Sequence, residues 1–404
     1  MVGSHRSSMV LLACALLCAC GGDDDVSVEV DASMTLPIDH EPTIVPNLDA
    51  GALPLDADVS VDAGWTWSLP TGFPTPVVPD DNAMSYAKIA AGRHLFYDVR
   101  MSGNDTQSCA SCHKQEHAFA DVVPVSIGST GEPHTRSPMS LANVAYAPTL
   151  TWANPLMVAL ERQAQVPTFG DAPVELGMHS MPDLEAKFRA IPEYAPMMQE
   201  AFPDEAEPIT TGNLLKALAA FERTLISGDS PYDRWQAGDE RAVSDSAKRG
   251  HQLFSSEKLE CFHCHGGFAF TDHATWQGQA FLATPFHNTG LYDVDHLGAY
   301  PAPNRGVYEI TLKGKDMGMF KAPTLRNVAV TAPYMHDGSI ATLSEVLDHY
   351  AAGGRAHSFR TDGLLVGFTL TDQERADVLA FLESLTDDAF LTNPALSDPW
   401  PHAP

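Results

Sequence analysis

The five-residue pattern Cys-x-x-Cys-His occurs twice in this chain, at residues 109–113 and again at residues 261–265. The chain has seven cysteines, and the other three, Cys14, Cys18 and Cys20, fall within its first 20 residues. Two thiols at this spacing can add to the two vinyl groups of one porphyrin, and the histidine that follows then lies beneath the iron. The duplicated pattern therefore predicts two covalently bound haem c groups, one in each half of the chain.

A structural zinc site is the alternative interpretation, because a Cys-x-x-Cys pair is also half of many zinc sites. A zinc ion would have to combine two distant pairs and leave both histidines unused, so we favour haem. The predicted haem-attachment residues are Cys109, Cys112 and His113 for the first group, and Cys261, Cys264 and His265 for the second.

The N-terminus has the pattern of an export signal. His5 and Arg6 precede an apolar run at residues 9–19, which is too short to span a bilayer and is typical of a signal peptide. The run ends in a Leu-Cys-Ala-Cys-Gly segment that resembles a bacterial lipobox, with cleavage before Cys20. We therefore expect a lipoprotein-type signal peptide at residues 1–20, a periplasmic location and a lipid on Cys20 as the only membrane attachment. A soluble periplasmic protein cut nearby is the alternative.

Charge is strongly acidic, with 52 Asp and Glu against 24 Lys and Arg and a formal net charge of -28. Nucleic-acid binding requires basic patches, so a nucleic-acid partner is excluded. Residues 21–82 contain no Lys or Arg and are rich in Asp, Pro and Gly. A segment of that composition cannot bury enough apolar surface to fold alone. We interpret it as a disordered acidic tether and lead-in.

The remainder of the chain has mainly helical patterns. The phrases "SYAKIAAGRHLF" and "SAKRGHQLF" share Ala-Lys and Gly-x-x-Leu-Phe, with Gly92 and Gly250 at equivalent places before each Cys-x-x-Cys-His. This weak repeat predicts two related halves. An apolar stripe predicts a helix over residues 211–226. Capping boxes that begin at Thr342 and Thr371 predict two more helix starts.

Several longer phrases carry a family resemblance: "GRHLFYDVRMSGNDTQSCASCH", "PVSIGSTG", "SLANVAYAPTLTWANP", "VPTFGDAPVELGM" and "FKAPTLRNVAVTAPYMHDGSIATLSEVLDHYAAGG". In this order they cover residues 82–385, which resemble the bacterial di-haem cytochrome c peroxidases. Within that superfamily the chain is most similar to the MauG-type branch, which includes the methanobactin-cluster enzymes. The resemblance implies an all-α fold of two cytochrome c-like domains, each with one haem c. They are expected at residues 83–235, which hold the peroxide-reacting haem, and at 236–390, followed by a tail at 391–404.

The resemblance also implies an enzyme, a peroxidase-type oxidoreductase. Hydrogen peroxide is expected to react at an open haem, and an external protein donor is then oxidised by long-range electron transfer. A tryptophan of a partner protein is the donor favoured by the MauG-type pattern. Two alternatives stay open: a peroxidase that takes electrons from a small cytochrome, and a di-haem electron carrier in which both irons are closed.

The resemblance implies that His113 and His265 are the proximal iron ligands. In reductively activated members a histidine after the "SIG" phrase closes the first iron, but Ser129 stands there in this chain. An open first haem that needs no prior reduction is therefore implied. His134, five residues further on, is the remaining candidate for a closing ligand.

At the second haem the resemblance places Tyr350 opposite His265, with Met335 as the rival ligand. Residues Leu343, Leu347 and Tyr350 share one face of an expected helix. A methionine ligand raises the reduction potential and suits an electron relay, whereas a phenol oxygen favours oxidised iron. Tyr350 therefore favours a site that stores an oxidising equivalent.

By the same resemblance Trp152 is an aromatic bridge between the haems, and Gln163 and Glu175 line the peroxide pocket. Glu175 is expected to move the proton from the near to the far peroxide oxygen as a general acid–base.

Family members also hold a calcium ion next to an asparagine, a position taken here by Arg136. The remaining candidate calcium ligands are Thr331 and Pro333, through their backbone oxygens. Because a second cation beside Arg136 is electrostatically unfavourable, a calcium ion and its replacement by the guanidinium both stay open.

Overall fold

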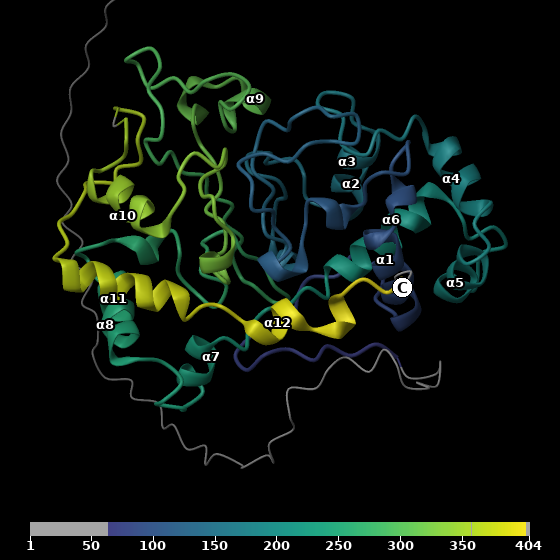
Figure 1. Ribbon diagram of the computed structural model, residues 1–404, viewed down its shortest axis with the longest axis horizontal. Coiled ribbons are helices and arrows are strands. Elements are labelled where there is room, and N and C mark those ends of the chain that lie inside the picture. Colours follow the sequence, from purple (N-terminus) through teal and green to yellow (C-terminus); the bar gives the residue numbers. More distant parts are fainter. Residues whose placement is uncertain (1–63, 357, 401–404) are drawn as a thin grey trace, which may run out of the picture. The chain divides into compact units, whose positions relative to one another are not determined.

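The computed structural model describes residues 64–356 and 358–400. The expected signal peptide, the lipid anchor at Cys20 and residues 21–63 of the tether lie outside the described residues. Within the described part, helices are joined by long loops, and β-structure is limited to isolated bridges such as Lys114 with Ala120 and Tyr334 with Ile340. The helices and loops form two halves (Figure 1). None of the described helices is long and apolar enough to cross a membrane.

The α-helices are α1 (Tyr86–Tyr97), α2 (Leu160–Gln163), α3 (Gln165–Phe169), α4 (Met181–Arg189), α5 (Tyr194–Ala201), α6 (Thr211–Glu222), α7 (Pro231–Gln236), α8 (Asp245–Phe254), α9 (Tyr308–Thr311), α10 (Leu343–Ala351), α11 (Asp372–Glu383) and α12 (Asp388–Thr392). The 3₁₀ helices are η1 (Val99–Met101), η2 (Cys109–Ser111), η3 (Gln115–His117), η4 (Val144–Tyr146), η5 (Cys261–His263), η6 (Gly314–Asp316), η7 (Val328–Val330) and η8 (Pro394–Leu396).

In the N-terminal half, α1 packs closely against α6. Gly92 of α1 faces the α6 backbone, where an added Cβ would clash with the carbonyl oxygen of Ala217 and approach Phe221. The stripe predicted on the second helix is buried, with Leu214, Leu218 and Phe221 all at 1% exposure or less. These side chains join Leu95, Phe96, Phe188 and Tyr194 in one apolar core.

In the C-terminal half, α8 packs against α11 in the equivalent way. An added Cβ at Gly250 would clash with the carbonyl oxygen of Asp377 and approach Phe381. The core of this half contains Phe254, Phe270, Val378 and Phe381. The shared Gly-x-x-Leu-Phe phrase is thus explained, because each glycine allows a helix to pack tightly before a Cys-x-x-Cys-His segment.

Both predicted capping boxes are confirmed. The Thr342 hydroxyl accepts from the Glu345 amide at the start of α10, and the Thr371 hydroxyl accepts from the Glu374 amide at the start of α11. Each glutamate accepts in return from the backbone of its threonine.

A buried polar network joins the two halves. Asn143 and Asn327 each precede a 3₁₀ helix and both adopt the left-handed conformation, with φ of 61°. The side-chain amide of Asn143 donates to the Ser227 carbonyl oxygen at 2.9 Å, and the side-chain amide of Asn327 donates to the Ser227 hydroxyl at 2.9 Å. Asp387 accepts from the Ser227 hydroxyl at 3.1 Å. This single serine therefore ties equivalent loops of both halves to the segment that precedes α12.

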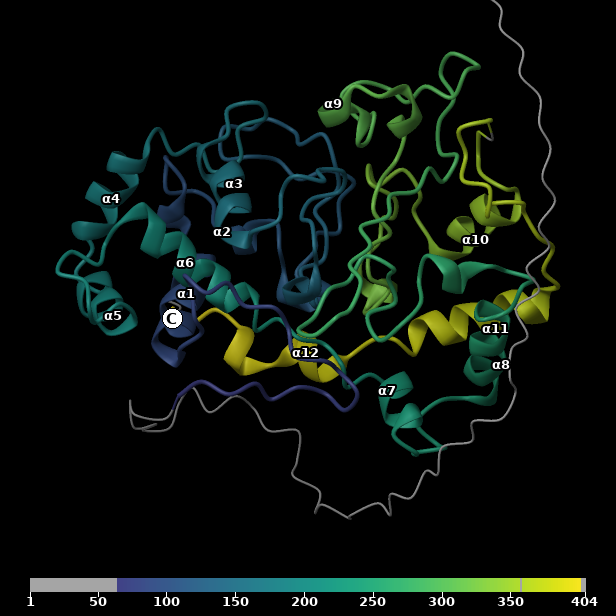
Figure 2. The same ribbon diagram turned by 180° about the vertical axis from the view of Figure 1, so that it is seen from behind.

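The C-terminal segment returns to the N-terminal half (Figures 1 and 2, yellow). The Tyr97 hydroxyl donates to the Leu396 carbonyl oxygen at 2.7 Å, and Trp400 Nε1 donates to the His94 carbonyl oxygen at 3.1 Å. Phe390 and Leu396 are buried in the N-terminal core. The expected tail thus contributes to packing of the first half.

Candidate functional site

Each Cys-x-x-Cys-His segment forms one 3₁₀ turn, η2 in the first half and η5 in the second. The amide of His113 donates to the Cys109 carbonyl oxygen at 3.0 Å, and the amide of His265 donates to the Cys261 carbonyl oxygen at 2.9 Å. All four thiols are free. Burial raises the pKa of the Cys261 thiol to about 12, so this sulfur is a neutral thiol at ordinary pH. The two turns thus present the same set of groups.

The two histidine rings are oriented alike. Nδ1 of His113 donates to the carbonyl oxygen of Phe119 at 2.7 Å, and Nδ1 of His265 donates to that of Phe270 at 3.2 Å. Burial lowers the pKa of both imidazoles, which favours the neutral form. A backbone hydrogen bond on one nitrogen fixes the ring and leaves Nε2 as the ligand nitrogen, as in metal-bound histidines.

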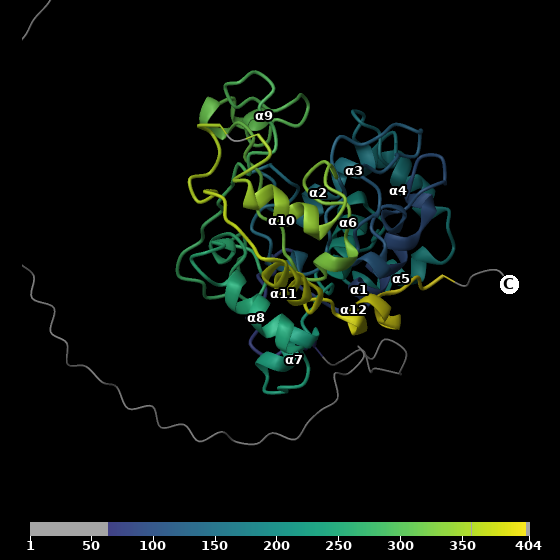
Figure 3. The same cartoon turned by 60° about the vertical axis from the view of Figure 1, so that its left-hand side comes forward.

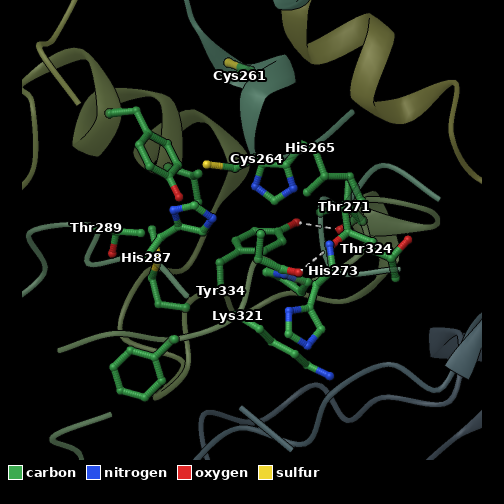
Figure 4. Close-up of a pocket in the computed structure, with 18 of the residues that line it drawn as sticks. Cys261, Cys264, His265, Thr271, His273, His287, Thr289, Lys321, Thr324 and Tyr334 are labelled. Carbon is green, nitrogen blue, oxygen red and sulfur yellow. Dashed lines mark hydrogen bonds between the residues drawn. The ribbon is translucent and has the colours of Figure 1, made fainter. Parts of the chain in front are cut away.

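A cavity of about 290 Å³ opens beside His265 and is lined mostly by apolar side chains. The His265 ring and the Cys264 thiol face it together (Figure 4). Tyr350 and Met335, the two candidate distal ligands, both line this cavity. From α10, Leu343, Val346 and Leu347 line it with Tyr350, as the predicted helical face requires.

The phenol of Tyr350 has no hydrogen-bond partner among the residues that the structure describes. Burial raises its pKa above the usual value. Because Tyr350 lines the cavity and its hydroxyl makes no hydrogen bond to a described residue there, this oxygen is suited to a group that enters the cavity. The two thiols, the neutral His265 imidazole and this phenol fit a covalently attached haem.

Charged groups also reach this cavity, and sequence analysis missed them. His287 is held between Asp272, at 2.7 Å from Nε2, and Asp362, at 2.8 Å from Nδ1. Although burial disfavours the imidazolium, the two carboxylates raise the pKa of His287 to about 12. Lys321 is buried, which lowers its pKa to about 8, and its ammonium donates to the Thr149 carbonyl oxygen at 3.2 Å. The ammonium of Lys321 supplies positive charge that suits a propionate of a haem, whereas the charge of His287 is already balanced by its two carboxylates.

Lys321 had a signal in the sequence, because a lysine within the otherwise apolar phrase "FKAP" is unusual. His287 had none, since its two carboxylate partners lie 15 and 75 residues away along the chain.

In the N-terminal half, Glu175 lies beside the loop that contains Ser129. The Ser129 amide donates to the Glu175 carbonyl oxygen at 2.7 Å. His134 Nδ1 lies 4.0 Å from Glu175 Oε1, and the Glu175 side chain is 30% exposed. Burial raises the pKa of Glu175 to about 7. His134 Nε2 is buried and has no partner in the described part of the chain.

Gln163 ends α2, and its side chain makes no hydrogen bond to Glu175 or any other described residue. Trp152 lies between the halves, where its Nε1 donates to the Ser137 carbonyl oxygen at 2.7 Å and its own carbonyl oxygen accepts from the Lys321 amide at 3.0 Å. Its ring lines the cavity that also contains His265 and Tyr350. The structure thus brings Trp152 to the C-terminal site, as a bridge would require.

A buried carboxyl on α6 lies near the first attachment turn. Glu222 is 6% exposed, and burial raises its pKa to about 8. Its Oε2 has no partner among residues 64–356 and 358–400. An acidic residue in the apolar helix phrase "LAAFERTLI" was the sequence signal for this feature, which the analysis overlooked.

Arg136, in the position of the family's calcium-binding asparagine, is already paired. Its guanidinium donates to Glu309 at 2.8 Å and to the Asn304 side chain at 3.0 Å. The Ser137 amide next to it donates to the His336 carbonyl oxygen at 2.8 Å, which brings this loop to the segment after Pro333. Thr331 and Pro333 both line the cavity that contains Tyr350.

Comparisons with known proteins agree with this arrangement. Residues 86–241 match the family described as di-haem cytochrome c peroxidase, and residues 247–386 match cytochrome c. The methylamine utilization protein MauG of Methylorubrum extorquens is 36% identical over 322 residues, which cover 79% of this chain and 84% of that protein. The chain belongs to the di-haem cytochrome c peroxidase/MauG family.

Two further relatives are informative. The cytochrome c551 peroxidase of Pseudomonas aeruginosa is 31% identical over 73% of this chain and 77% of its own length. A solved MauG-like protein associated with microbial copper homeostasis is 48% identical, with a TM-score of 0.81, and the match covers 84% of this chain and all of that one.

Family membership confirms the predicted all-α fold of two cytochrome c-like domains and the peroxidase-type oxidoreductase activity. It supports two haem c groups and decides against a structural zinc site. Hydrogen peroxide and a protein donor are the partners that the family implies in general.

Proposed function

We propose that this protein is a MauG-type enzyme, which reacts with hydrogen peroxide in its N-terminal half and oxidises a side chain of a partner protein, best a tryptophan. The observation that supports this choice is the position of Tyr350, whose unpartnered phenol lines the same cavity as His265. A phenol oxygen disfavours the reduced iron that a simple electron relay requires. The site is instead suited to hold an oxidising equivalent.

The proposed attachments follow from the two turns. Cys109 and Cys112 would bind the first haem and His113 its iron. In the second half, Cys261 and Cys264 would bind the haem, and His265 and Tyr350 would bind its iron.

In the N-terminal half, a bound haem iron would supply the oxidising chemistry with peroxide. Ser129 would leave that iron open, because its short hydroxyl cannot replace a histidine ligand. Glu175 would take the proton from one peroxide oxygen and return it to the other, and its pKa of about 7 suits both steps. Gln163 would orient the peroxide through its free side-chain amide.

Trp152 would carry electrons between the halves. Its backbone and ring are both fixed, by hydrogen bonds to Lys321 and Ser137. A rigid aromatic ring at the boundary of the C-terminal cavity suits that role.

A cytochrome-linked peroxidase is the second candidate. Met335 lines the same cavity as Tyr350, and a methionine ligand would raise the potential enough for electrons to come from a small cytochrome.

Export, with a lipid anchor at Cys20, and domains at 83–235 and 236–390 remain parts of the proposal.

The test is to mix the oxidised holoprotein with hydrogen peroxide, without prior reduction, and to record its absorption spectrum. An immediate spectral change that decays only when a donor is added supports the MauG-type assignment. A spectrum that stays unchanged until one haem is reduced supports the cytochrome-linked peroxidase. A spectrum that changes neither before nor after reduction would indicate an electron carrier without peroxidase activity.

A further inference from the structure

A chain of aromatic rings runs from Phe270, which is hydrogen-bonded to His265, to Trp235 of α7. The His265 ring is hydrogen-bonded to the Phe270 carbonyl oxygen, and the Phe270 ring contacts Tyr232 with centroids 5.1 Å apart. Tyr232 in turn contacts Trp235, with centroids 6.0 Å apart. His251 touches both of these rings, at 5.5 Å from each. Such spacings correspond to rings in direct contact.

Tyr232 also shares a cavity with His265. The two side chains line a space of about 430 Å³ together with His251, Phe254 and Phe270. The path from the proposed proximal ligand to Tyr232 consists of one hydrogen bond to the Phe270 carbonyl oxygen, the Phe270 residue itself and one ring contact.

Trp235 forms the outer end of the chain. Its Nε1 donates to the Glu240 carboxylate at 3.3 Å, and Lys248 of α8 lies 5.9 Å from its ring centroid. Lys248 and Glu240 are themselves paired at 2.8 Å. In Figure 3, α7 lies below α8, and the contact of the Trp235 ring with the His251 ring joins the two helices. The indole thus has a proton acceptor on its nitrogen, and the nearby positive charge is neutralised.

We propose that Tyr232 and Trp235 are relay residues through which the external donor gives electrons to the C-terminal site. This inference rests on the proposed function. In the relay, one electron leaves the Trp235 indole through Tyr232 to the peroxide-oxidised C-terminal site, and the Nε1 proton moves to Glu240. The donor then returns one electron to the indolyl radical, and the proton returns from Glu240.

Trp276 and the Trp65–Trp67 pair fit this relay less well. Trp276 contacts Phe268, at 5.9 Å, in a cluster that has no hydrogen bond to His265. Trp65 contacts both Trp67 and Tyr86 in the N-terminal half. Trp276 and Trp67 therefore serve as comparison residues.

The experiment treats oxidised holoprotein with hydrogen peroxide in air and without a donor, and locates oxygenated residues by peptide mass spectrometry. An indolyl radical that no donor reduces reacts with dioxygen, so we expect oxygenated tryptophan at Trp235. Trp235→Phe should lose this mark, Tyr232→Phe should diminish it, and Trp276→Phe should leave it unchanged. Peroxide consumption is followed in the same samples.

The outcomes distinguish a failure of the relay from a failure of the proposed peroxidase function. Peroxide consumption with marks at Trp276, with equal marks at Trp67 and Trp235, or with no mark at Trp235 would overturn the relay alone. A protein that consumes no peroxide would overturn the proposed function and the relay together.

Discussion

The imidazole Nδ1 of His134 lies 4.0 Å from Oε1 of Glu175. The sequence suggests His134 only as a ligand that closes the first iron, but its ring lies beside the proposed proton carrier. Burial lowers the pKa of His134 and raises that of Glu175 to about 7. A neutral imidazole and a carboxyl group that titrates near neutrality suit proton transfer.

This relationship predicts the pH dependence of the reaction with peroxide. Glu175 must be ionised to accept a proton, and the carboxylate predominates above its pKa, so the rate constant should rise as the pH increases through about 7. Glu175→Gln should abolish this rise and slow the reaction by roughly 10²–10⁴-fold. Stopped-flow absorbance measures both effects. Glu200→Gln, an exposed carboxylate on α5, is the matched control, and an unchanged rate in Glu175→Gln would remove Glu175 from the mechanism.

Replacement of the phenol in the C-terminal cavity should change the electron affinity of the site. In Tyr350→Met, a thioether would replace the phenol oxygen, and the reduction potential of the C-terminal haem should rise because methionine favours reduced iron. Spectroelectrochemical titration measures the shift. Tyr97→Phe, which alters a tyrosine bound to the Leu396 carbonyl oxygen, should leave the potential unchanged. If the reduction potential in Tyr350→Met equals that of the parent protein, Tyr350 is not the ligand.

Arg136 should make the protein independent of calcium. Its guanidinium is already bound by Glu309 and Asn304, and it would repel a second cation nearby. A chelator should therefore leave the thermal unfolding temperature of the parent unchanged, whereas Arg136→Asn should gain stabilisation by added calcium. Arg241→Asn, on an exposed loop, should gain none. A fall in the parent's unfolding temperature on chelation would instead indicate a bound calcium ion.

The contact between α8 and α11 predicts a stability effect. In Gly250→Ala, the new methyl group would collide with the Asp377 carbonyl oxygen, and overpacking of this kind costs about 1–3 kcal/mol. Gly212→Ala is the matched control within a helix, because its Cβ would meet only the Thr210 hydroxyl at 3.9 Å. The control should be neutral or slightly stabilising, since alanine favours helix. Thermal unfolding compares the two, and an equal response would refute the packing role of Gly250.

Local signals in the sequence were sufficient for much of the fold. The capping boxes at Thr342 and Thr371 were predictable because all of their partners lie within four residues. The equivalence of Gly92 and Gly250 was predictable because a helix that packs tightly leaves a small residue in its own sequence. The haem-attachment turns are local for the same reason.

Contacts between distant segments were not predictable. Ser227 binds both Asn143 and Asn327, but nothing near Ser227 in the chain indicates either partner. The return of Trp400 to the N-terminal half likewise depends on how the two halves meet. At the site, His287 acquires its charge from carboxylates that only the fold brings together.

The central claim is that the N-terminal iron has an open position and that Tyr350 caps the C-terminal one. Electron paramagnetic resonance of the resting oxidised holoprotein tests it most directly. We predict a high-spin signal that persists in His134→Ala, together with a second signal that changes in Tyr350→Met. Two fully low-spin signals in the parent, or a second signal that is identical in Tyr350→Met, would contradict the claim.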